Sequence, residues 1–138
     1  MAGYSGTPLG KKLGFKEGLR AALVNPPKGF RQELGPLPND VAISVGSPAK
    51  PVDLILLFVD SQKSLKSNFL RLARKLVPNG MLWIAWPKKA SGIVTDLSDN
   101  SVRLIGLDAG LVDVKVCAIN DIWSGLKFVY RLADRQAR

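Results

Sequence analysis

The stretch VDLILLFV, residues 52–59, decides the fold class. Apolar residues fill every position except Asp53, so a strand formed here is apolar on both of its faces. A strand of this kind lies at the centre of a parallel sheet that is covered by helices on both sides. We therefore predict an α/β domain with residues 52–59 as its central strand.

The chain alternates between helix and strand after this segment. Apolar residues spaced as on one face of a helix lie between residues 61 and 77, and Pro78-Asn79-Gly80 is expected to end this helix. A second helix is predicted at 97–110, and strands are predicted at 81–86, 112–119 and 126–132. The helical links are long enough for right-handed parallel crossovers, whereas the short link before the last strand makes that strand antiparallel.

The N-terminal part of the chain supplies the remaining elements. Residues 1–18 are predicted to form an extension with one short helix, which begins near Thr7 and ends at Gly14. Strands are expected at 20–25 and 41–45, with a short helix at 30–34 between them. Together these patterns predict a three-layer, Rossmann-like α/β domain over residues 19–132, with a mostly parallel sheet of about six strands and an antiparallel C-terminal strand. Residues 133–138 are expected to form a polar tail.

The composition is typical of one basic globular domain. At 138 residues, with 46% hydrophobic and 22% charged residues, the chain is long enough to bury a single core. It has 20 lysines and arginines against 11 aspartates and glutamates, which gives a net charge of +9. This excess favours contacts with polyanions, so an anionic small molecule or a nucleic acid is a candidate partner. Because the charges are spread along the chain, a basic surface without a specific partner is the alternative.

Several chemistries lack the residues that they need. Cys117 is the only cysteine and histidine is absent, so an intramolecular disulfide, a Cys–His pair and Ser-His-Asp hydrolysis are excluded. The same absences make a metal site unexpected. The first residues show no signal-peptide pattern, and the longest apolar stretches are too short to cross a bilayer. We expect a cytoplasmic protein with no membrane partner, and the oligomeric state stays open.

The second half of the chain resembles a known enzyme class. The segments DLILLF and LARKLVPNGMLWIAW, followed by an antiparallel terminal pair of strands, are similar to the back half of class I S-adenosylmethionine-dependent methyltransferases. This likeness covers residues 52–132. It implies an abbreviated methyltransferase-like fold.

The first half departs from that class at the cofactor motif. The class has a glycine-rich turn after its first strand and an acidic residue at the end of its second strand. This chain has Asn25-Pro26-Pro27-Lys28-Gly29 and Val45-Gly46 at these places. The two prolines remove two backbone donors and stiffen the turn. We therefore expect no cofactor, and S-adenosylmethionine only under the alternative of a divergent methyltransferase.

Two further resemblances concern the first turn and the chain as a whole. Asn25-Pro26-Pro27 is similar to the Asn-Pro-Pro-aromatic motif of amino-group methyltransferases, but that motif follows the fourth strand of the class, so a rigid turn explains it better. The whole chain resembles a small family known as domain of unknown function 3052, which implies no assigned activity. The segments that carry this likeness are TPLGKKLGFKEG, ALVNPPKGF, LWIAWPKKASG, TDL and VDVKVCAINDIWSGLKFVYR.

A candidate ligand site follows from the rule that open α/β sheets bind ligands beyond the carboxyl ends of their parallel strands. The residues expected there are Asn25, Lys28, Asp60, Ser61, Trp86, Lys88, Lys89, Ser91, Trp123 and Ser124. Lys88-Lys89 beside a loop of small residues suits a phosphate or carboxylate, although the spacing of a phosphate-binding loop is absent.

These residues also have structural interpretations. Asp60-Ser61 and Thr95-Asp96 precede predicted helices, where N-cap residues are expected. Trp86 can belong to the core, Lys88-Lys89 to a solvated loop, and Cys117 to the interior as an inert thiol.

Three functions therefore stay open. The first is a non-catalytic module that binds an anionic small molecule or nucleic acid through Lys88 and Lys89. The second is a divergent methyltransferase, and the third is a protein–protein interaction subunit. The sequence favours the first.

Overall fold

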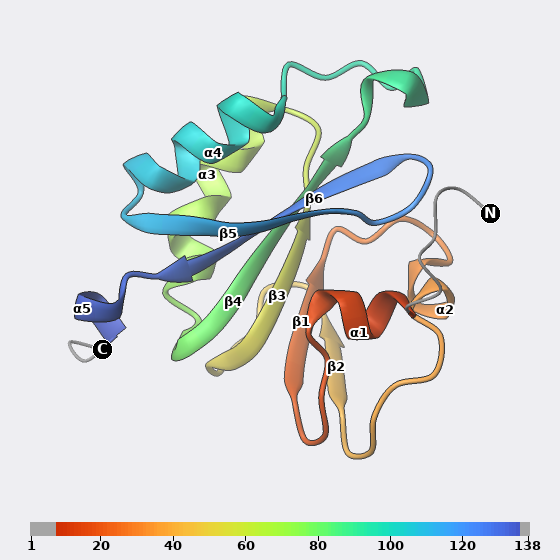
Figure 1. Cartoon of the computed structure of the whole chain (residues 1–138), viewed down its shortest axis with the longest axis vertical. Coiled ribbons are helices and arrows are strands. Elements are labelled where there is room, and N and C mark those ends of the chain that lie inside the picture. Colours follow the sequence, from red (N-terminus) through yellow and green to blue (C-terminus); the bar gives the residue numbers. More distant parts are fainter. Residues whose placement is uncertain (1–7, 136–138) are drawn as a thin grey trace.

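The sheet has six strands in the order β2-β1-β3-β4-β6-β5 (Figure 1). The structure is a computed structural model that describes residues 8–135. The strands are β1 (Arg20–Val24), β2 (Ala42–Val45), β3 (Val52–Phe58), β4 (Leu76–Pro87), β5 (Leu111–Ala118) and β6 (Trp123–Tyr130). Strands β1 to β4 are parallel, and β6 pairs antiparallel with both β4 and β5. The predicted Rossmann-like class with an antiparallel C-terminal strand is confirmed.

Helices cover both faces of this sheet. They are α1 (Leu9–Leu13), α2 (Phe30–Glu33), α3 (Gln62–Ala73), α4 (Asp99–Asp108) and α5 (Leu132–Arg135), with a 3₁₀ turn η1 (Lys89–Ser91). Helices α3 and α4 pack on one face, and α1 and α2 pack on the other (Figure 1). The result is the three-layer arrangement that the alternating elements predict.

Strand β3 lies at the centre, as its sequence predicts. Its residues Leu54 to Leu57 are fully buried. Ile55 and Leu57 contribute to the core under α3 and α4, whereas Leu54 and Leu56 contribute to the core on the side of α1 and α2. Successive side chains of a strand point to opposite faces of the sheet, so a strand buried between two helical layers must be apolar on both faces.

Buried polar groups tie the layers together. The indole N–H of Trp83 in β4 donates to the carbonyl of Leu13 at 2.8 Å, which fixes α1 to the sheet.

On the other face, α4 approaches β6 so closely that a Cβ on Gly106 would lie 2.0 Å from the Phe128 ring. Glycine is therefore required at this helix position.

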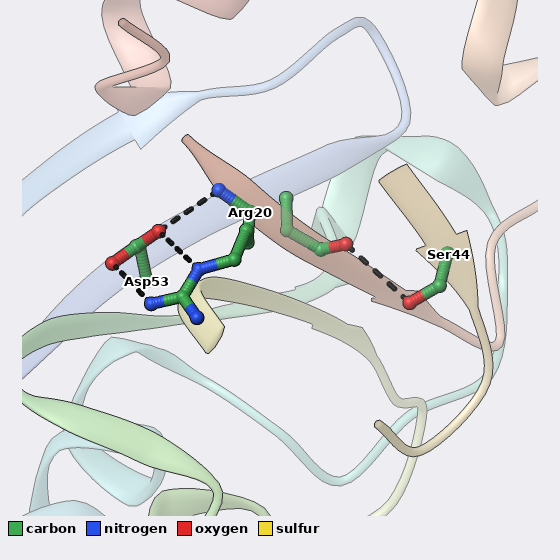
Figure 2. Close-up of polar contacts among 4 residues, drawn as sticks. Arg20, Ser44 and Asp53 are labelled. Carbon is green, nitrogen blue, oxygen red and sulfur yellow. Dashed lines mark hydrogen bonds and ion pairs between the residues drawn. The ribbon is translucent and has the colours of Figure 1, made fainter. Parts of the chain in front are cut away.

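Side-chain hydrogen bonds join the strands near the amino edge of the sheet. Asp53 accepts hydrogen bonds from the backbone N–H of Arg20 at 2.9 Å and from its guanidinium at 3.3 and 3.4 Å (Figure 2). The Ser44 hydroxyl donates to the carbonyl of Ala21 at 3.5 Å. These contacts join the beginnings of β1 and β3 and tie β2 to β1.

The sequence prediction was wrong about the end of α3. The helix ends at Ala73, and Pro78-Asn79-Gly80 lie inside β4 instead of separating helix from strand. The backbone N–H of Val52 donates to the carbonyl of Lys75 at 2.9 Å, so pairing with β3 begins earlier than expected. The β3–β4 register then shifts between Val52 and Leu54, and such an irregularity accommodates a proline that has no N–H to donate.

The last strand also begins earlier than predicted. The side-chain oxygen of Asn120 accepts hydrogen bonds from the backbone N–H groups of Ile122 and Trp123, both at 2.9 Å. This side chain closes the turn, so β6 begins at Trp123. A helical turn, α5, occupies the start of the expected polar tail; Thr7 and residues 136–138 lie outside the described residues.

Candidate functional site

The loops that follow β1 and β3 run to opposite faces of the sheet. These two strands are parallel neighbours, but the chain leaves β1 toward α2 on one face and leaves β3 toward α3 on the other. The two loops therefore part at the carboxyl edge, which is where ligands bind in open α/β sheets. A hollow of about 260 Å³ lies there, lined by Asn25, Phe58, Val59, Asp60, Ser64 and Trp123.

The turn after β1 forms one side of this hollow. Asn25 has a φ of 57°, in the left-handed region that asparagine tolerates better than most residues. Two residues on, the carbonyl of Pro27 accepts the N–H of Phe30 at 3.0 Å, which starts α2. Pro26 and Pro27 have no N–H, so this turn offers a ligand fewer backbone donors than a glycine-rich turn would.

Aromatic rings form the wall of the hollow. Phe58 at the end of β3 meets Trp123 at the start of β6 in an edge-to-face contact, with ring centroids 5.1 Å apart. Phe58 also contacts the buried Phe30 of α2, at 4.8 Å between centroids. The Trp123 ring is half-buried, so it is held by packing and still borders the hollow.

The polar side of the hollow is acidic. Asp60 is exposed, and neither a hydrogen bond nor an ion pair joins its carboxylate to any residue between 8 and 135. Its carbonyl accepts the Thr95 hydroxyl at 2.7 Å, which brings the loop before α4 against the loop after β3. Asp96 follows Thr95 in that loop, so a second carboxylate lies at the same end of α3.

The start of α3 is satisfied by the protein itself. Ser61 is the N-cap, and its hydroxyl oxygen accepts the backbone N–H of Ser64 at 3.1 Å. The carboxylate of Asp96 accepts the N–H of Gln62 at 2.8 Å, and the Gln62 amide donates back to the Asp96 carbonyl at 2.8 Å. Since these amides already have acceptors and the carboxylates of Asp60 and Asp96 lie at this helix start, the edge suits a cationic group better than a phosphate.

These contacts revise the predicted caps. The Ser61 cap is confirmed, but Thr95-Asp96 does not cap α4. Ser98 is the N-cap of α4 and forms a capping box with Ser101. Asp96 instead caps α3 from another part of the chain.

The structure brings three of the ten predicted site residues to the hollow: Asn25, Asp60 and Trp123. Ser61 is a helix cap beside the hollow, and Lys28 is exposed. Trp86 is 3% exposed and belongs to the core under α3 and α4. Ser124 pairs with Trp86 across β4 and β6. Lys88, Lys89 and Ser91 form the turn around η1. They are not among the residues that line the hollow, and their role as an anion site stays a prediction.

Sequence reasoning missed three lining residues: Phe58, Val59 and Ser64. Phe58 and Val59 read as core because they end an apolar run. Ser64 lies three residues after the Ser61 cap, and that spacing places it in the first turn of α3 and near the same sheet edge. This helical spacing was the signal that could have identified it.

Two kinds of feature are absent from residues 8–135. No helix there is long and apolar enough to span a bilayer. No group of three His, Cys, Asp or Glu side chains is arranged to hold a metal ion.

Neither a family model nor a curated protein matches the sequence. Solved structures do match the fold. An S-adenosylmethionine-dependent methyltransferase from Aquifex aeolicus is 17% identical, with a TM-score of 0.63 and coverage of 86% of this chain and 85% of that one. A Haloferax volcanii protein solved with a methyltransferase activator is 13% identical, with a TM-score of 0.60 and coverage of 88% and 86%.

A third similar structure is the magnesium protoporphyrin IX methyltransferase of Synechocystis, solved with S-adenosylhomocysteine and with S-adenosylmethionine bound. The first of these is 10% identical, with a TM-score of 0.56 and coverage of 89% of this chain and 78% of that one. These structures overturn the expectation of no cofactor, which rested on the Pro26-Pro27 turn and on the missing acidic residue after the second strand. At these identities the likeness shows the fold, and that fold is the one of class I S-adenosylmethionine-dependent methyltransferases.

Proposed function

We propose that the chain binds S-adenosylmethionine in the hollow between β1 and β3 and is a divergent methyltransferase. One observation carries this proposal: Asp60, whose carboxylate has no partner among residues 8–135, and the packed aromatic ring of Trp123 border the same hollow where the loops of β1 and β3 part. The fold, which methyltransferases with bound S-adenosylmethionine share, supports the same conclusion.

The chemistry of the lining residues fits the cationic end of this ligand. S-adenosylmethionine carries a sulfonium and an ammonium group, and Asp60 offers a negative charge at the border of the hollow. Aromatic faces attract cations, and Trp123 and Phe58 also suit an adenine ring. When bound, the ligand supplies an electrophilic methyl group, and these residues would bind it, orient it and exclude water.

The fit is incomplete at the other end of the ligand. Strand β2 ends in Val45-Gly46, so no acidic side chain stands at its end for ribose hydroxyls. The Pro26-Pro27 turn offers few amides. We therefore expect binding to depend on side chains of the hollow more than on backbone contacts. For this reason Asp60→Asn should cause a large loss of affinity.

Calorimetry and thermal unfolding with S-adenosylmethionine, S-adenosylhomocysteine and ATP test this proposal. A ligand at about 100 times its dissociation constant adds about 2.7 kcal/mol to the free energy of unfolding. We expect stabilisation by S-adenosylmethionine and weaker binding by at least tenfold in Asp60→Asn, a change of about 1.4 kcal/mol. Trp123→Phe should weaken binding less, because an aromatic ring is retained.

Asp40→Asn is the matched control, since it makes the same change at an exposed residue with a φ of 62° that asparagine also tolerates. It should bind like the unchanged protein. No stabilisation by S-adenosylmethionine, or equal effects of Asp40→Asn and Asp60→Asn, would remove the proposal. Stabilisation by ATP alone, lost in Lys88→Gln/Lys89→Gln, would restore the anion-binding module. The likeness to domain of unknown function 3052 and the nucleic-acid partner at Lys88 and Lys89 stay predictions.

A further inference from the structure

A second charged feature lies on the hairpin of β5 and β6, away from the hollow. Lys115 in β5 stands directly opposite Lys127 in β6. Lys127 is also the partner of Trp83 in the β4–β6 register, and Trp83 packs into the core on the side of α1. The two lysines therefore occupy the α1 side of the sheet, beyond the area that α1 covers.

Lys12 of α1 joins this pair at its border. Its ammonium group donates to the carbonyl of Ala118, the last residue of β5, at 3.3 Å. We call Lys12, Lys115 and Lys127 the lysine face. Burial raises the pKa of the Cys117 thiol, and the charges of Lys12 and Lys115 oppose that rise. Lys115 and Cys117 alternate along β5 on the same side of the sheet, next to Ala118, whose carbonyl Lys12 contacts.

The lysine face is not neutralised by acidic side chains of the described chain. The ion pairs between residues 8 and 135 are Arg20–Asp53 and Arg103–Asp113, and neither includes a residue of the lysine face. Burial lowers the pKa of Lys127, and the charge of Lys115 lowers it further. Like charges directly opposite each other on a sheet are destabilising, so this arrangement costs the fold stability.

The β-bulge in β5 produces this arrangement. The register between β5 and β6 shifts between Asp113 and Lys115. Asp113 stands opposite Phe128, faces α4 and pairs with Arg103 at 3.0 Å. The nearest carboxylate of β5 is thereby turned to the other side of the sheet, and Lys115 is placed beside Lys127. Bulges commonly re-aim side chains in this way.

We propose that the lysine face binds the phosphodiester backbone of nucleic acid, for which a single strand is the probe. Phosphate contacts need ammonium groups and little else, and their strength comes from the release of counterions. A protein partner would need apolar or aromatic anchors. Two apolar residues of β5 are exposed: Val116 stands opposite Leu126 and so belongs to the α4 side, and Val114 is a single valine in the bulge. Val112 and Val129 are only half-exposed, so the lysine face has no cluster of apolar anchors. The inference does not depend on the proposed methyl donor.

The test is fluorescence anisotropy with a labelled mixed-sequence RNA of about 20 nucleotides, titrated over a range of salt concentrations. Each phosphate contact on a single strand contributes about 0.7 to the slope of log affinity against log salt. We expect Lys12→Gln/Lys115→Gln/Lys127→Gln to reduce that slope by about 2 and to weaken binding at low salt at least tenfold.

The control is Lys50→Gln/Lys63→Gln/Lys66→Gln, which removes the same three charges from exposed positions elsewhere, so that both variants carry +6 instead of +9. The affinity of this control for the RNA at low salt should fall less than threefold. Equal losses in the two variants would show that only net charge matters and would overturn the proposal. Because Lys127 is half-buried, Lys12→Gln/Lys115→Gln is the second variant, with an expected slope change of about 1.4.

Two competitors complete the test. Single-stranded DNA of the same sequence should compete about as well as unlabelled RNA if the backbone alone is bound, and a preference for RNA would add a contact to the 2′-hydroxyl within the same proposal. Polyglutamate should compete weakly. Tighter binding of polyglutamate than of RNA, lost in the lysine-face variant alone, would overturn the proposal in favour of an acidic protein partner.

Discussion

Strand β3 has an aspartate at each end, and the two have opposite surroundings. Asp53 at the amino edge accepts three hydrogen bonds from Arg20 (Figure 2). Asp60, just past the carboxyl edge, has no side-chain partner among the described residues and borders the hollow. The carboxylate near the amino edge is thus used by the fold, whereas the one past the carboxyl edge borders the hollow in which we propose that a ligand binds.

The largest test of this difference compares two alanine variants. Asp53→Ala should lower the free energy of unfolding by about 1.5 kcal/mol, because it leaves the Arg20 backbone N–H and guanidinium without their acceptor. Asp60→Ala should change it by less than about 0.5 kcal/mol. Urea unfolding of both variants measures the difference. Equal losses would show that Asp60 has the same structural role as Asp53 and would break the comparison.

A smaller effect is expected from the guanidinium alone. Arg20→Gln keeps the backbone N–H that Asp53 accepts, and the Arg20 side chain is 54% exposed. We expect a loss of about 0.5 kcal/mol. A double-mutant cycle of Arg20→Gln with Asp53→Ala should give a coupling energy of similar size. The control cycle pairs Asp53→Ala with Arg31→Gln, an exposed arginine, and should give no coupling energy. A coupling energy between Asp53 and Arg31 would mean that the loss reflects the net charge of the protein instead of the Arg20–Asp53 contact.

The smallest effect is the pH dependence of the amino edge. Burial alone would raise the pKa of Asp53, but the hydrogen bonds and charge of Arg20, with the charge of Lys16, lower it below 3.8. Because the folded-state pKa is the lower one, this stabilisation is complete above the unfolded-state pKa and is lost as the pH falls through the folded-state pKa. Between neutral pH and about pH 3, the unfolding midpoint in urea should fall less for Asp53→Asn than for the unchanged protein. Parallel curves would rule out Asp53 as the titrating group.

The same strand shows how much of the fold the sequence contains. VDLILLFV predicts a buried central strand because its apolar pattern is local and leaves no polar face. The junction of α3 and β4 was misplaced because Pro78 usually ends an element, whereas here it lies at a register irregularity formed with β3. That pairing joins residues distant in the sequence, and no local pattern reveals it.

The candidate site was predictable only in part for the same reason. Asp60 and Ser61 share one local signal, that of a helix cap, and the structure divides the roles: Ser61 caps α3 and Asp60 borders the hollow. The contact of Asp96 with Gln62 spans 34 residues. The contact between Phe58 and Trp123 depends on the position of β6 in the sheet. Local spacing identified the edge of the sheet, and tertiary contacts selected the residues.

The strand order also bears on how the chain folds during synthesis on the ribosome. Strand β6 lies between β4 and β5, although it is the last of the three to be made. Until residues 123–130 leave the exit tunnel, β5 has no strand to pair with and the edge of β4 stays open. Open edges are where nascent chains aggregate. The interval between translation of β4 and translation of β6 is therefore a period in which the nascent chain exposes open strand edges.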